Sequence, residues 1–253
     1  MHSAEELREL VAAYLAELVL TPELGKLAEP LRYAVGGKLI RPVLCLATAE
    51  AAGSSAEEAL AAGVGVELVH SFSLVHDDLP ALDDDDVRRG KPTVHVEYGE
   101  RTAILVGDAL LAEAMRLALT YESPHVAREL ARATLRMIGG QELDFAGGTA
   151  RESVHRLKTA ALFEAPVACA LWVARVPEDE QRTWRRFGFE TGMLFQAVDD
   201  LLDEDGLVEE RGAEATRTLA DELAARARAA LAELDADTTV LEGMVDMLVT
   251  RTA

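Results

Sequence analysis

The sequence predicts an all-α protein that folds as a single domain over residues 1–253. Aromatic residues make up only 5% of the chain, and no segment alternates β-branched and aromatic residues with polar ones as a strand does. Prolines lie where helical patterns begin or break, at Pro22, Pro30, Pro42, Pro92, Pro124 and Pro177. With 49% hydrophobic residues, a chain of this length can bury a sizeable core.

Helical periodicity and capping signals predict a series of helices. We expect them over residues 4–20, 24–35, 40–52, 56–79, 99–120, 124–147, 151–173, 178–204, 213–234 and 237–251. The connections between them are short, and the chain has no internal repeat or low-complexity segment. Long helices joined by short loops pack antiparallel, so we expect a bundle of about ten helices around a central cavity.

Charge and cysteine usage narrow the class of protein. The net charge is −20, which disfavours binding to nucleic acid or to an anionic membrane surface. Cys45 and Cys169 lie in apolar helical surroundings without partners at metal-ligand spacing, which indicates small buried side chains in a reducing compartment. The N-terminus does not resemble a signal peptide, and no stretch approaches the ~20 uncharged apolar residues of a membrane span. We therefore expect a cytoplasmic protein.

Two aspartate clusters close apolar helical stretches more than a hundred residues apart. The first comprises Asp77, Asp78 and Asp83, and the second comprises Asp199, Asp200 and Asp203. Two carboxylates about 4 Å apart repel each other by ~4 kcal/mol at an effective dielectric near 20, so facing clusters need cations between them. Oxygen ligands without cysteine favour Mg²⁺, whose shell is completed by water and substrate phosphates.

Each cluster alone is also compatible with a solvated acidic helix end. Spacing favours the metal site for the second one, because Asp199 and Asp203 are four residues apart on one helix face and follow a mostly apolar run. We expect the helix ending at Asp77 and the helix containing Asp199 to face each other.

Basic residues near the first cluster predict anion binding. In Gly36-Gly37-Lys38-Leu39-Ile40-Arg41-Pro42, glycines allow close backbone approach and two cations open a helix whose N-terminal end favours anions. A plain loop-to-helix junction with surface cations fits this heptad as well. The pair Arg88 and Arg89 either neutralises the neighbouring aspartates or binds phosphate oxygens in bidentate fashion.

Two histidines precede the first cluster. His70 lies two helical turns before Asp77 on the same face, so it either shares the cavity or packs in the core. His76 is adjacent to Asp77 on a different face, and we expect it to be structural.

Taken together, these motifs resemble the trans-isoprenyl diphosphate synthases, and among them the bacterial farnesyl diphosphate synthases. The ordered set is Gly36-Gly37-Lys38-x-x-Arg41-Pro42, His70-x-Phe72-Ser73-Leu74-Val75-His76-Asp77-Asp78-Leu79-Pro80-Ala81-Leu82-Asp83, Arg88-Arg89-Gly90, Gly107-Asp108, Gly140-Gln141-x-x-Asp144, Lys158-Thr159-x-x-Leu162-Phe163 and Phe195-Gln196-x-x-Asp199-Asp200-x-x-Asp203. It spans residues 36 to about 205. Each motif alone is weak, but seven in order make a chance match improbable.

The resemblance implies an isoprenoid synthase fold, usually homodimeric, that condenses isopentenyl diphosphate with dimethylallyl or geranyl diphosphate. The catalytic residues would be Asp77, Asp83, Asp199 and Lys158. Asp78, Asp200 and Asp203 would help Asp77, Asp83 and Asp199 hold Mg²⁺, expected to be about three ions per site. By the same resemblance, Lys38, Arg41, His70 and Arg89 would bind isopentenyl diphosphate, and Arg88, Lys158, Thr159 and Gln196 would bind the allylic diphosphate.

Phe72 bears on product length. It lies five residues before Asp77, about 7 to 8 Å lower along a helix, with the small Ser73 beside it. With the insertion Pro80-Ala81, this pattern resembles the farnesyl enzymes, and Phe72 would be the floor of a pocket for a C15 chain. If Phe72 merely packs between helices, a geranylgeranyl (C20) product is equally expected.

The pattern fails after Asp203. The family usually continues with lysines that bind the allylic diphosphate, but this chain has no lysine beyond Lys158. Losing one charge-assisted contact costs roughly 1.5 to 3 kcal/mol unless it is replaced, and Arg211 or Arg217 are the candidates. Rival interpretations are a class I terpene cyclase, which needs no Lys38 or Arg41, and a non-catalytic partner subunit of a synthase, which would be expected to lose metal-binding aspartates.

Overall fold

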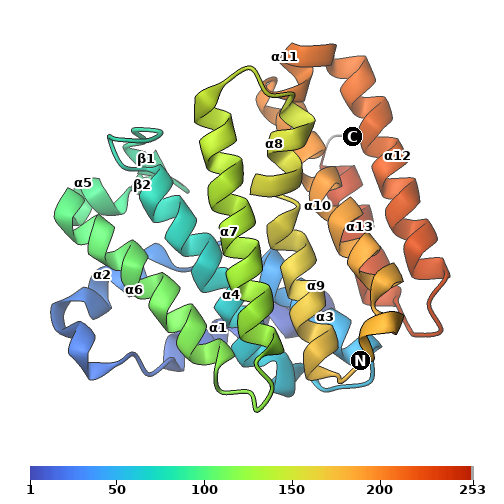
Figure 1. Cartoon of the computed structure of the whole chain (residues 1–253), viewed down its shortest axis with the longest axis horizontal. Coiled ribbons are helices and arrows are strands. Elements are labelled where there is room, and N and C mark those ends of the chain that lie inside the picture. Colours follow the sequence, from blue (N-terminus) through green and yellow to red (C-terminus); the bar gives the residue numbers. More distant parts are fainter. Residues whose placement is uncertain (252–253) are drawn as a thin grey trace.

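The computed structural model describes residues 1–251 and is almost entirely helical (Figure 1). Its helices are α1 (Ala4–Glu17), η1 (Pro22–Leu27), α2 (Ala28–Ala34), α3 (Ile40–Ala51), α4 (Ala56–Asp77), α5 (Val94–Tyr98), α6 (Glu100–Ala118), α7 (His125–Ala146), α8 (Arg151–Lys158), α9 (Ala161–Val173), η2 (Glu178–Glu180), α10 (Arg182–Asp203), α11 (Leu207–Arg211), α12 (Ala213–Ala232) and α13 (Thr239–Thr250). The all-α prediction is confirmed.

A short hairpin interrupts the helices. Strands β1 (Val87–Arg88) and β2 (Lys91–Pro92) pair antiparallel, with Arg88 opposite Lys91. The two turn residues between them, Arg89 and Gly90, have φ angles of 54° and 74°, and positive φ at both positions is the geometry of a type I′ turn. The helical periodicity did not predict this hairpin, which fixes the directions of Arg88 and Arg89.

The predicted helix over 151–173 is two helices in the structure, α8 and α9, separated at Thr159 and Ala160. The break lets the chain approach α10 closely. A side chain at Gly192 of α10 would place its Cβ 2.7 Å from the Cα of Ala160, so only glycine fits there. The Thr159 hydroxyl then donates a hydrogen bond of 2.7 Å to Gln196 Oε1. Boundaries of the other long helices agree with the prediction to within three residues, except that 3₁₀ turns precede α2 and α10.

Helix α4 is the central helix of the bundle. A capping box of Ser55 and Glu58 begins it, and it packs against α3, α6 and α9. By length and composition α4 could cross a membrane, but 67% of its most apolar window is buried inside the protein. Its apolar character is therefore explained by its place in the core.

We expected α4 and α10 to face each other; they do not pack directly against each other along their length. Each of them packs against α9, which lies between them (Figure 1). Because α9 begins only at Ala161, the cavities described below lie beside its N-terminal end, where α4 and α10 carry their aspartates.

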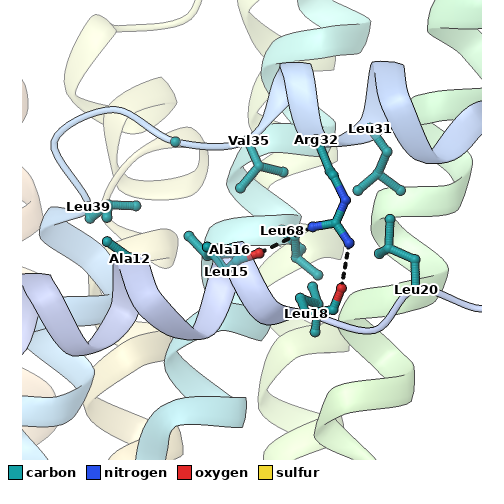
Figure 2. A pocket seen from close by; sticks show the side chains of 11 residues that line it. Ala12, Leu15, Ala16, Leu18, Leu20, Leu31, Arg32, Val35, Leu39 and Leu68 are labelled. Carbon is teal, nitrogen blue, oxygen red and sulfur yellow. Dashed lines mark hydrogen bonds between the residues drawn. The ribbon is translucent and has the colours of Figure 1, made fainter.

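An apolar hollow of about 350 Å³ lies between α1 and α2 (Figure 2). Arg32 of α2 donates hydrogen bonds to the carbonyl oxygens of Leu15 and Leu18, at 3.4 and 2.7 Å, and so ties α2 to the end of α1. Leu39 lines this hollow and also a second cavity on its other side. The N-terminal helices thus support the loop that carries Lys38.

Candidate active site

The motif residues gather at one end of the bundle. The hairpin, the carboxyl end of α4, α8, α11 and the described C-terminal end all lie in the upper part of Figure 1. Three cavities open there, and we call them the basic, polar and tail cavities.

The basic cavity has a volume of about 610 Å³. It brings together residues from the loop before α3, from α3 and α4, from the hairpin and from α10: Lys38, Arg41, His70, Arg88, Arg89 and Asp199. All four residues predicted to bind isopentenyl diphosphate therefore line one cavity, although 51 residues separate Lys38 from Arg89 in sequence.

Backbone geometry at the glycine loop positions the cations. Gly37 has a φ of 109°, and a Cβ there would lie 2.6 Å from the guanidinium carbon of Arg89. Arg89 donates a hydrogen bond to the carbonyl oxygen of Gly36. Leu39, in the left-handed region with a φ of 52°, then begins α3 and puts Arg41 in its first turn. Gly37 is therefore needed so that the loop can lie against Arg89.

Arg41 is held in a buried, aromatic environment. Its guanidinium carbon lies 4.7 Å from the ring centroid of Phe163 and 5.7 Å from that of Phe195. Burial lowers the pKa of Arg41 to about 10, so it stays charged at neutral pH. Its Nε has no hydrogen-bond partner among the described residues. Such a group suits an anion that enters the cavity.

Glu67 is a site residue that the motifs did not identify. It lies three residues before His70 on α4, is 2% exposed and lines the basic cavity. Burial raises the pKa of Glu67 to about 7, against the opposing effect of Arg41 and Arg89. Burial, assisted by Arg41 and Arg89, holds the pKa of His70 well below its usual value, so this imidazole is neutral. A glutamate inside an otherwise apolar helical stretch was the available signal.

Arg251, just after α13, is a second residue that the motifs did not identify. It lines the basic cavity, and its Nη1 lies 3.1 Å from Asp199 Oδ1. Arg211, which the sequence suggested as a substitute for the missing lysine, instead forms an ion pair of 3.5 Å with Glu152. Arg217 is exposed on α12. The distant end of the chain, rather than the segment after Asp203, supplies the basic group near the second cluster.

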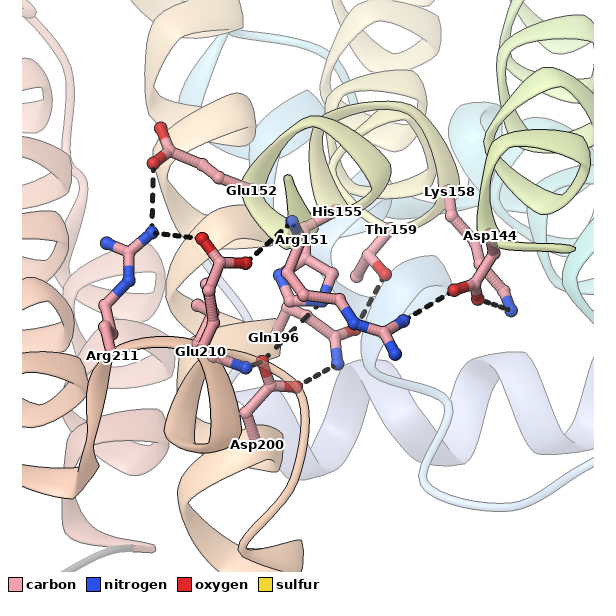
Figure 3. Close-up of polar contacts among 11 residues, drawn as sticks. Asp144, Arg151, Glu152, His155, Lys158, Thr159, Gln196, Asp200, Glu210 and Arg211 are labelled. Carbon is pink, nitrogen blue, oxygen red and sulfur yellow. Dashed lines mark hydrogen bonds and ion pairs between the residues drawn. The ribbon is translucent and has the colours of Figure 1, made fainter. Parts of the chain in front are cut away.

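The polar cavity, of about 430 Å³, collects the predicted allylic-site residues Lys158, Thr159 and Gln196 together with Asp200 (Figure 3). Gln196 accepts a hydrogen bond from Thr159 through Oε1 and donates one of 2.7 Å to Asp200 through Nε2. Lys158 Nζ lies 3.2 Å from Asp144 Oδ2. Arg88, the remaining predicted allylic-site residue, lines the basic cavity instead.

Both carboxylate oxygens of Asp200 accept hydrogen bonds from the protein in this structure. It is 2% exposed, and its Oδ2 accepts a hydrogen bond of 2.9 Å from the backbone N–H of Leu207, at the start of α11. Its other oxygen accepts from Gln196. Asp200 therefore folds the chain back directly after the second cluster, and its predicted role in holding metal stays a prediction.

The tail cavity, of about 350 Å³, lies between α4 and α7. Phe72, Ser73 and Asp77 line it from α4, and Met137 lines it from α7. The Phe72 ring packs edge to face on His76, with the centroids 5.1 Å apart, and His76 Nε2 lies 3.1 Å from the Ile104 carbonyl oxygen. His76 packs against the wall that Phe72 forms and also lines the tail cavity, so its expected structural role stays a prediction.

The aspartates supply the oxygen ligands that a hard cation such as Mg²⁺ needs, but the described protein side chains do not by themselves surround a metal ion. Among the described residues, no three His, Cys, Asp or Glu side chains are close enough to hold a metal ion. Burial, together with the charge of Asp83, raises the pKa of Asp77 to about 6 against the opposing effect of Lys158. Burial and the neighbouring Asp203 raise the pKa of Asp199 in the same way.

Carboxylates that repel each other in this way fit Mg²⁺, which takes one or two protein carboxylates and completes its shell with phosphate and water. Asp77 lines the tail cavity and Asp199 the basic cavity. Lys158, which lines the polar cavity with Asp200, also acts electrostatically on Asp77. Asp78 is held by Arg88, with 2.6 Å between Oδ1 and Nε.

The buried Glu67 predicts a pH-dependent stability. Because its pKa is raised in the folded state to about 7, the protonated form stabilises the fold at low pH, and this contribution is lost as pH rises through 7. Glu67→Gln should remove that loss, so the variant should gain about 2 kcal/mol relative to the wild type between about pH 5.5 and 8.5. Urea unfolding at both pH values measures it.

The exposed Glu122→Gln serves as the control and should leave the pH profile of the wild type unchanged. Parallel profiles for the wild type and Glu67→Gln would contradict the prediction.

A family model described as Polyprenyl synthetase matches residues 25–237 of the chain. Over 193 residues the chain is 40% identical to a farnesyl diphosphate synthase of Bacillus subtilis (strain 168). The matched region covers 70% of this chain and 65% of that protein. Over 238 residues it is 40% identical to a protein of Arabidopsis thaliana named heterodimeric geranylgeranyl pyrophosphate synthase large subunit 1, chloroplastic, covering 85% and 64% of the two. The chain thus matches less than two thirds of the length of these curated relatives.

Solved structures are similar over nearly their whole length. An apo structure of an FPP/GFPP synthase from Zymomonas mobilis superposes with a TM-score of 0.86 at 32% identity, covering 97% of each chain. A geranylgeranyl pyrophosphate synthase superposes with a TM-score of 0.88 at 26% identity, covering 100% of this chain and 99% of that one.

Proposed function

The chain belongs to the polyprenyl synthetase family, and on this premise we propose that it is a Mg²⁺-dependent prenyltransferase. It would condense isopentenyl diphosphate with an allylic diphosphate, head to tail. The observation that carries the proposal is the basic cavity, in which Lys38, Arg41 and Arg89 surround neutral His70 beside Asp199. A terpene cyclase, which takes no isopentenyl diphosphate, would have no use for such a cavity.

The first step of the reaction breaks the C1–O bond of the allylic diphosphate, and both electrons leave with the diphosphate. Bound Mg²⁺ would supply Lewis-acid stabilisation of that leaving group. Lys158 lies beside Asp144 in the polar cavity, where its ammonium would bind the growing negative charge. Interactions that strengthen as the charge develops lower the barrier rather than merely bind the substrate.

The second step forms the new carbon–carbon bond. The double bond of isopentenyl diphosphate attacks C1 of the allyl cation, and a proton is lost from C2 of the isopentenyl unit. The basic cavity would hold the diphosphate of this second substrate while Phe195, which lines the same cavity, excludes water. Water must be excluded because it would convert the cation to an alcohol.

The direct test is turnover. The purified protein, with Mg²⁺ and isopentenyl diphosphate, is incubated with dimethylallyl, geranyl or farnesyl diphosphate, and the products are identified by mass spectrometry. A product longer than the allylic substrate by C5 units supports the proposal. No elongation from any of the three allylic diphosphates would reject it and favour a non-catalytic partner subunit.

We propose farnesyl diphosphate as the main product. Phe72 is 7% exposed and lines the tail cavity five residues before Asp77, as expected of the floor of a C15 pocket. Relatives of similar identity include both a farnesyl and a geranylgeranyl synthase, so the C20 product is the alternative.

Removing the ring of Phe72 should lengthen the product. Phe72→Ala leaves a space of about one ring at the wall of the tail cavity, so the chain should accept a further C5 unit before it is released. Mass spectrometry of the products measures the shift. Phe189→Ala, at a half-buried phenylalanine of α10 that does not line the tail cavity, is the control and should not change the distribution. An unchanged distribution in Phe72→Ala would mean that Phe72 only packs between helices.

We also propose that Arg251 replaces the missing lysine. It is a cation beside Asp199 in the basic cavity, whereas Arg211 is engaged by Glu152. Arg251→Gln should raise the KM for one of the two diphosphates by about tenfold to a hundredfold, since a lost charge-assisted contact costs roughly 1.5 to 3 kcal/mol. Steady-state kinetics with each substrate varied in turn shows whether the KM for isopentenyl diphosphate or for the allylic diphosphate rises.

Arg211→Gln is the matched control for Arg251→Gln and should leave both KM values within about twofold of the wild type. The opposite pattern, with only Arg211→Gln affected, would restore the assignment that the sequence suggested.

We propose a homodimer that assembles through α6 and α7. These helices are adjacent (Figure 1). In the described structure they expose large apolar side chains, Ile104 at 47%, Leu105 at 45%, Leu135 at 71% and Ile138 at 49%, and Ile138 also lines the tail cavity. Exposed large apolar side chains on two adjacent helices favour an interface there. The name of the Arabidopsis thaliana relative describes a heterodimer, so a different subunit is the alternative partner.

Sedimentation velocity of the pure protein should give twice the mass of one chain. Leu135→Glu should shift it to the monomer, because a charge cannot be desolvated in the apolar interface. Val19→Glu, at a side chain 79% exposed on another part of the surface, should remain a dimer. A monomeric wild type would contradict the homodimer.

A cytoplasmic location is proposed as well. Cys45 and Cys169 are free and fully buried, as expected of small core residues in a reducing compartment.

A further inference from the structure

The amide of Gln141 on α7 is buried without partners. Both its Nε2 and its Oε1 lack a hydrogen bond to any described residue, and no other described side chain has two such atoms. A buried polar group left unsatisfied costs about 1 to 3 kcal/mol, so native proteins pair nearly all of them. The amide lines the tail cavity beside Asp77, which indicates that its partner is what enters the cavity.

Its neighbours on α7 change from apolar to charged along one face. Met137, four residues earlier, is 5% exposed and lines the tail cavity. Asp144, three residues later, forms an ion pair with Lys158 in the polar cavity. Residues three and four apart lie on the same side of a helix, so Gln141 lies between the apolar and the charged part.

Helix α4, on the other side of the tail cavity, shows the same order from apolar to charged residues. Phe72 and Ser73 line the apolar part, and Asp77 lies one turn further along. An allylic diphosphate has the same order: an apolar tail, the reacting carbons C1 to C3, and the diphosphate. With the tail beside Phe72 and Met137 and the diphosphate near Asp77 and Lys158, the reacting carbons lie beside Gln141.

The packing of α7 fixes the amide at this depth. A Cβ at Gly140 would lie 2.5 Å from the backbone nitrogen of Lys158, so α7 and α8 approach as closely as two backbones can. Because Gly140 precedes Gln141 directly, the height and rotation of Gln141 are set by backbone contact rather than by flexible side chains.

We infer that Gln141 is a catalytic residue whose side-chain carbonyl oxygen faces C1 to C3 of the allylic substrate. The inference rests on the proposed function. When the C1–O bond breaks and its electron pair leaves with the diphosphate, positive charge spreads over C1 and C3, and the amide dipole stabilises it. No proton moves in this step. A neutral amide suits the position, because a carboxylate would repel the diphosphate and could trap the cation as an ester.

Gln141→Met tests the inference, since methionine keeps the length of the side chain but removes the dipole. The single-turnover rate should fall on the order of 100-fold, the loss seen when one preorganised dipole is removed from a charged transition state. Affinity for geranyl thiolodiphosphate, an analogue whose bridging sulfur resists ionisation, should stay within about twofold by calorimetry with Mg²⁺, because the ground state carries no cation. Arg132→Met, an exposed position on α7, is the control and should change neither value.

The outcomes separate the possibilities. A rate within about threefold of the wild type overturns the inference. Affinity for the analogue that falls by the same factor as the rate also overturns it, because Gln141 would then hold the diphosphate or its metal ion. Absence of product from the wild type rejects the proposed function itself. The melting temperature should not fall, since methionine removes two unsatisfied atoms; if Gln141→Met is misfolded, Gln141→Leu is measured in the same way.

Discussion

The structure depends on one charge kept away from water, the guanidinium of Arg41. Side chains from three other helices meet around it: Glu67 of α4 and Asp199 of α10 act on it electrostatically, and the rings of Phe163 of α9 and Phe195 of α10 lie within cation–π distance. The guanidinium carbon of Arg251 lies 5.6 Å from the centroid of the same Phe195 ring. A buried cation of this kind is tolerated only with opposite charge and polarisable rings nearby. The helices must therefore pack so that these groups surround Arg41, and the same packing gives the cavity its charged lining.

The fold was predictable because it rests on local signals. Capping boxes, prolines at helix starts and unbroken helical periodicity are signals within the helix itself, and α4 has a capping box at Ser55 and helical periodicity as far as Asp77. The break at Thr159 was not predictable in this way. It depends on the absence of a side chain at Gly192, more than thirty residues later, which lets α10 approach Ala160. The hairpin turn at Arg89 and Gly90 likewise depends on its contact with Gly37.

The residues of the candidate site show the same difference between local signals and tertiary contacts. Lys38, Arg41, His70 and Arg89 were predicted because each belongs to a motif with fixed spacing, and the structure brings all four into one cavity. Glu67 and Arg251 belong to no such motif, and only the tertiary fold places them there. Asp200 shows the converse: its motif predicts a metal ligand, whereas the nearby N–H of Leu207 and the amide of Gln196 occupy its oxygens in this structure. Spacing identifies which residues converge, but not which contacts each one makes.

The contact between Gly37 and Arg89 links two loops that are far apart in sequence. Because the guanidinium fills the space where a side chain would be and bonds the carbonyl oxygen of Gly36, neither loop can shift without the other. The first turn of α3 and the hairpin are therefore expected to move together as one rigid unit. Any ligand that draws Arg89 inward would also carry Lys38 with it, so the two cations would close on an anion in concert rather than in sequence.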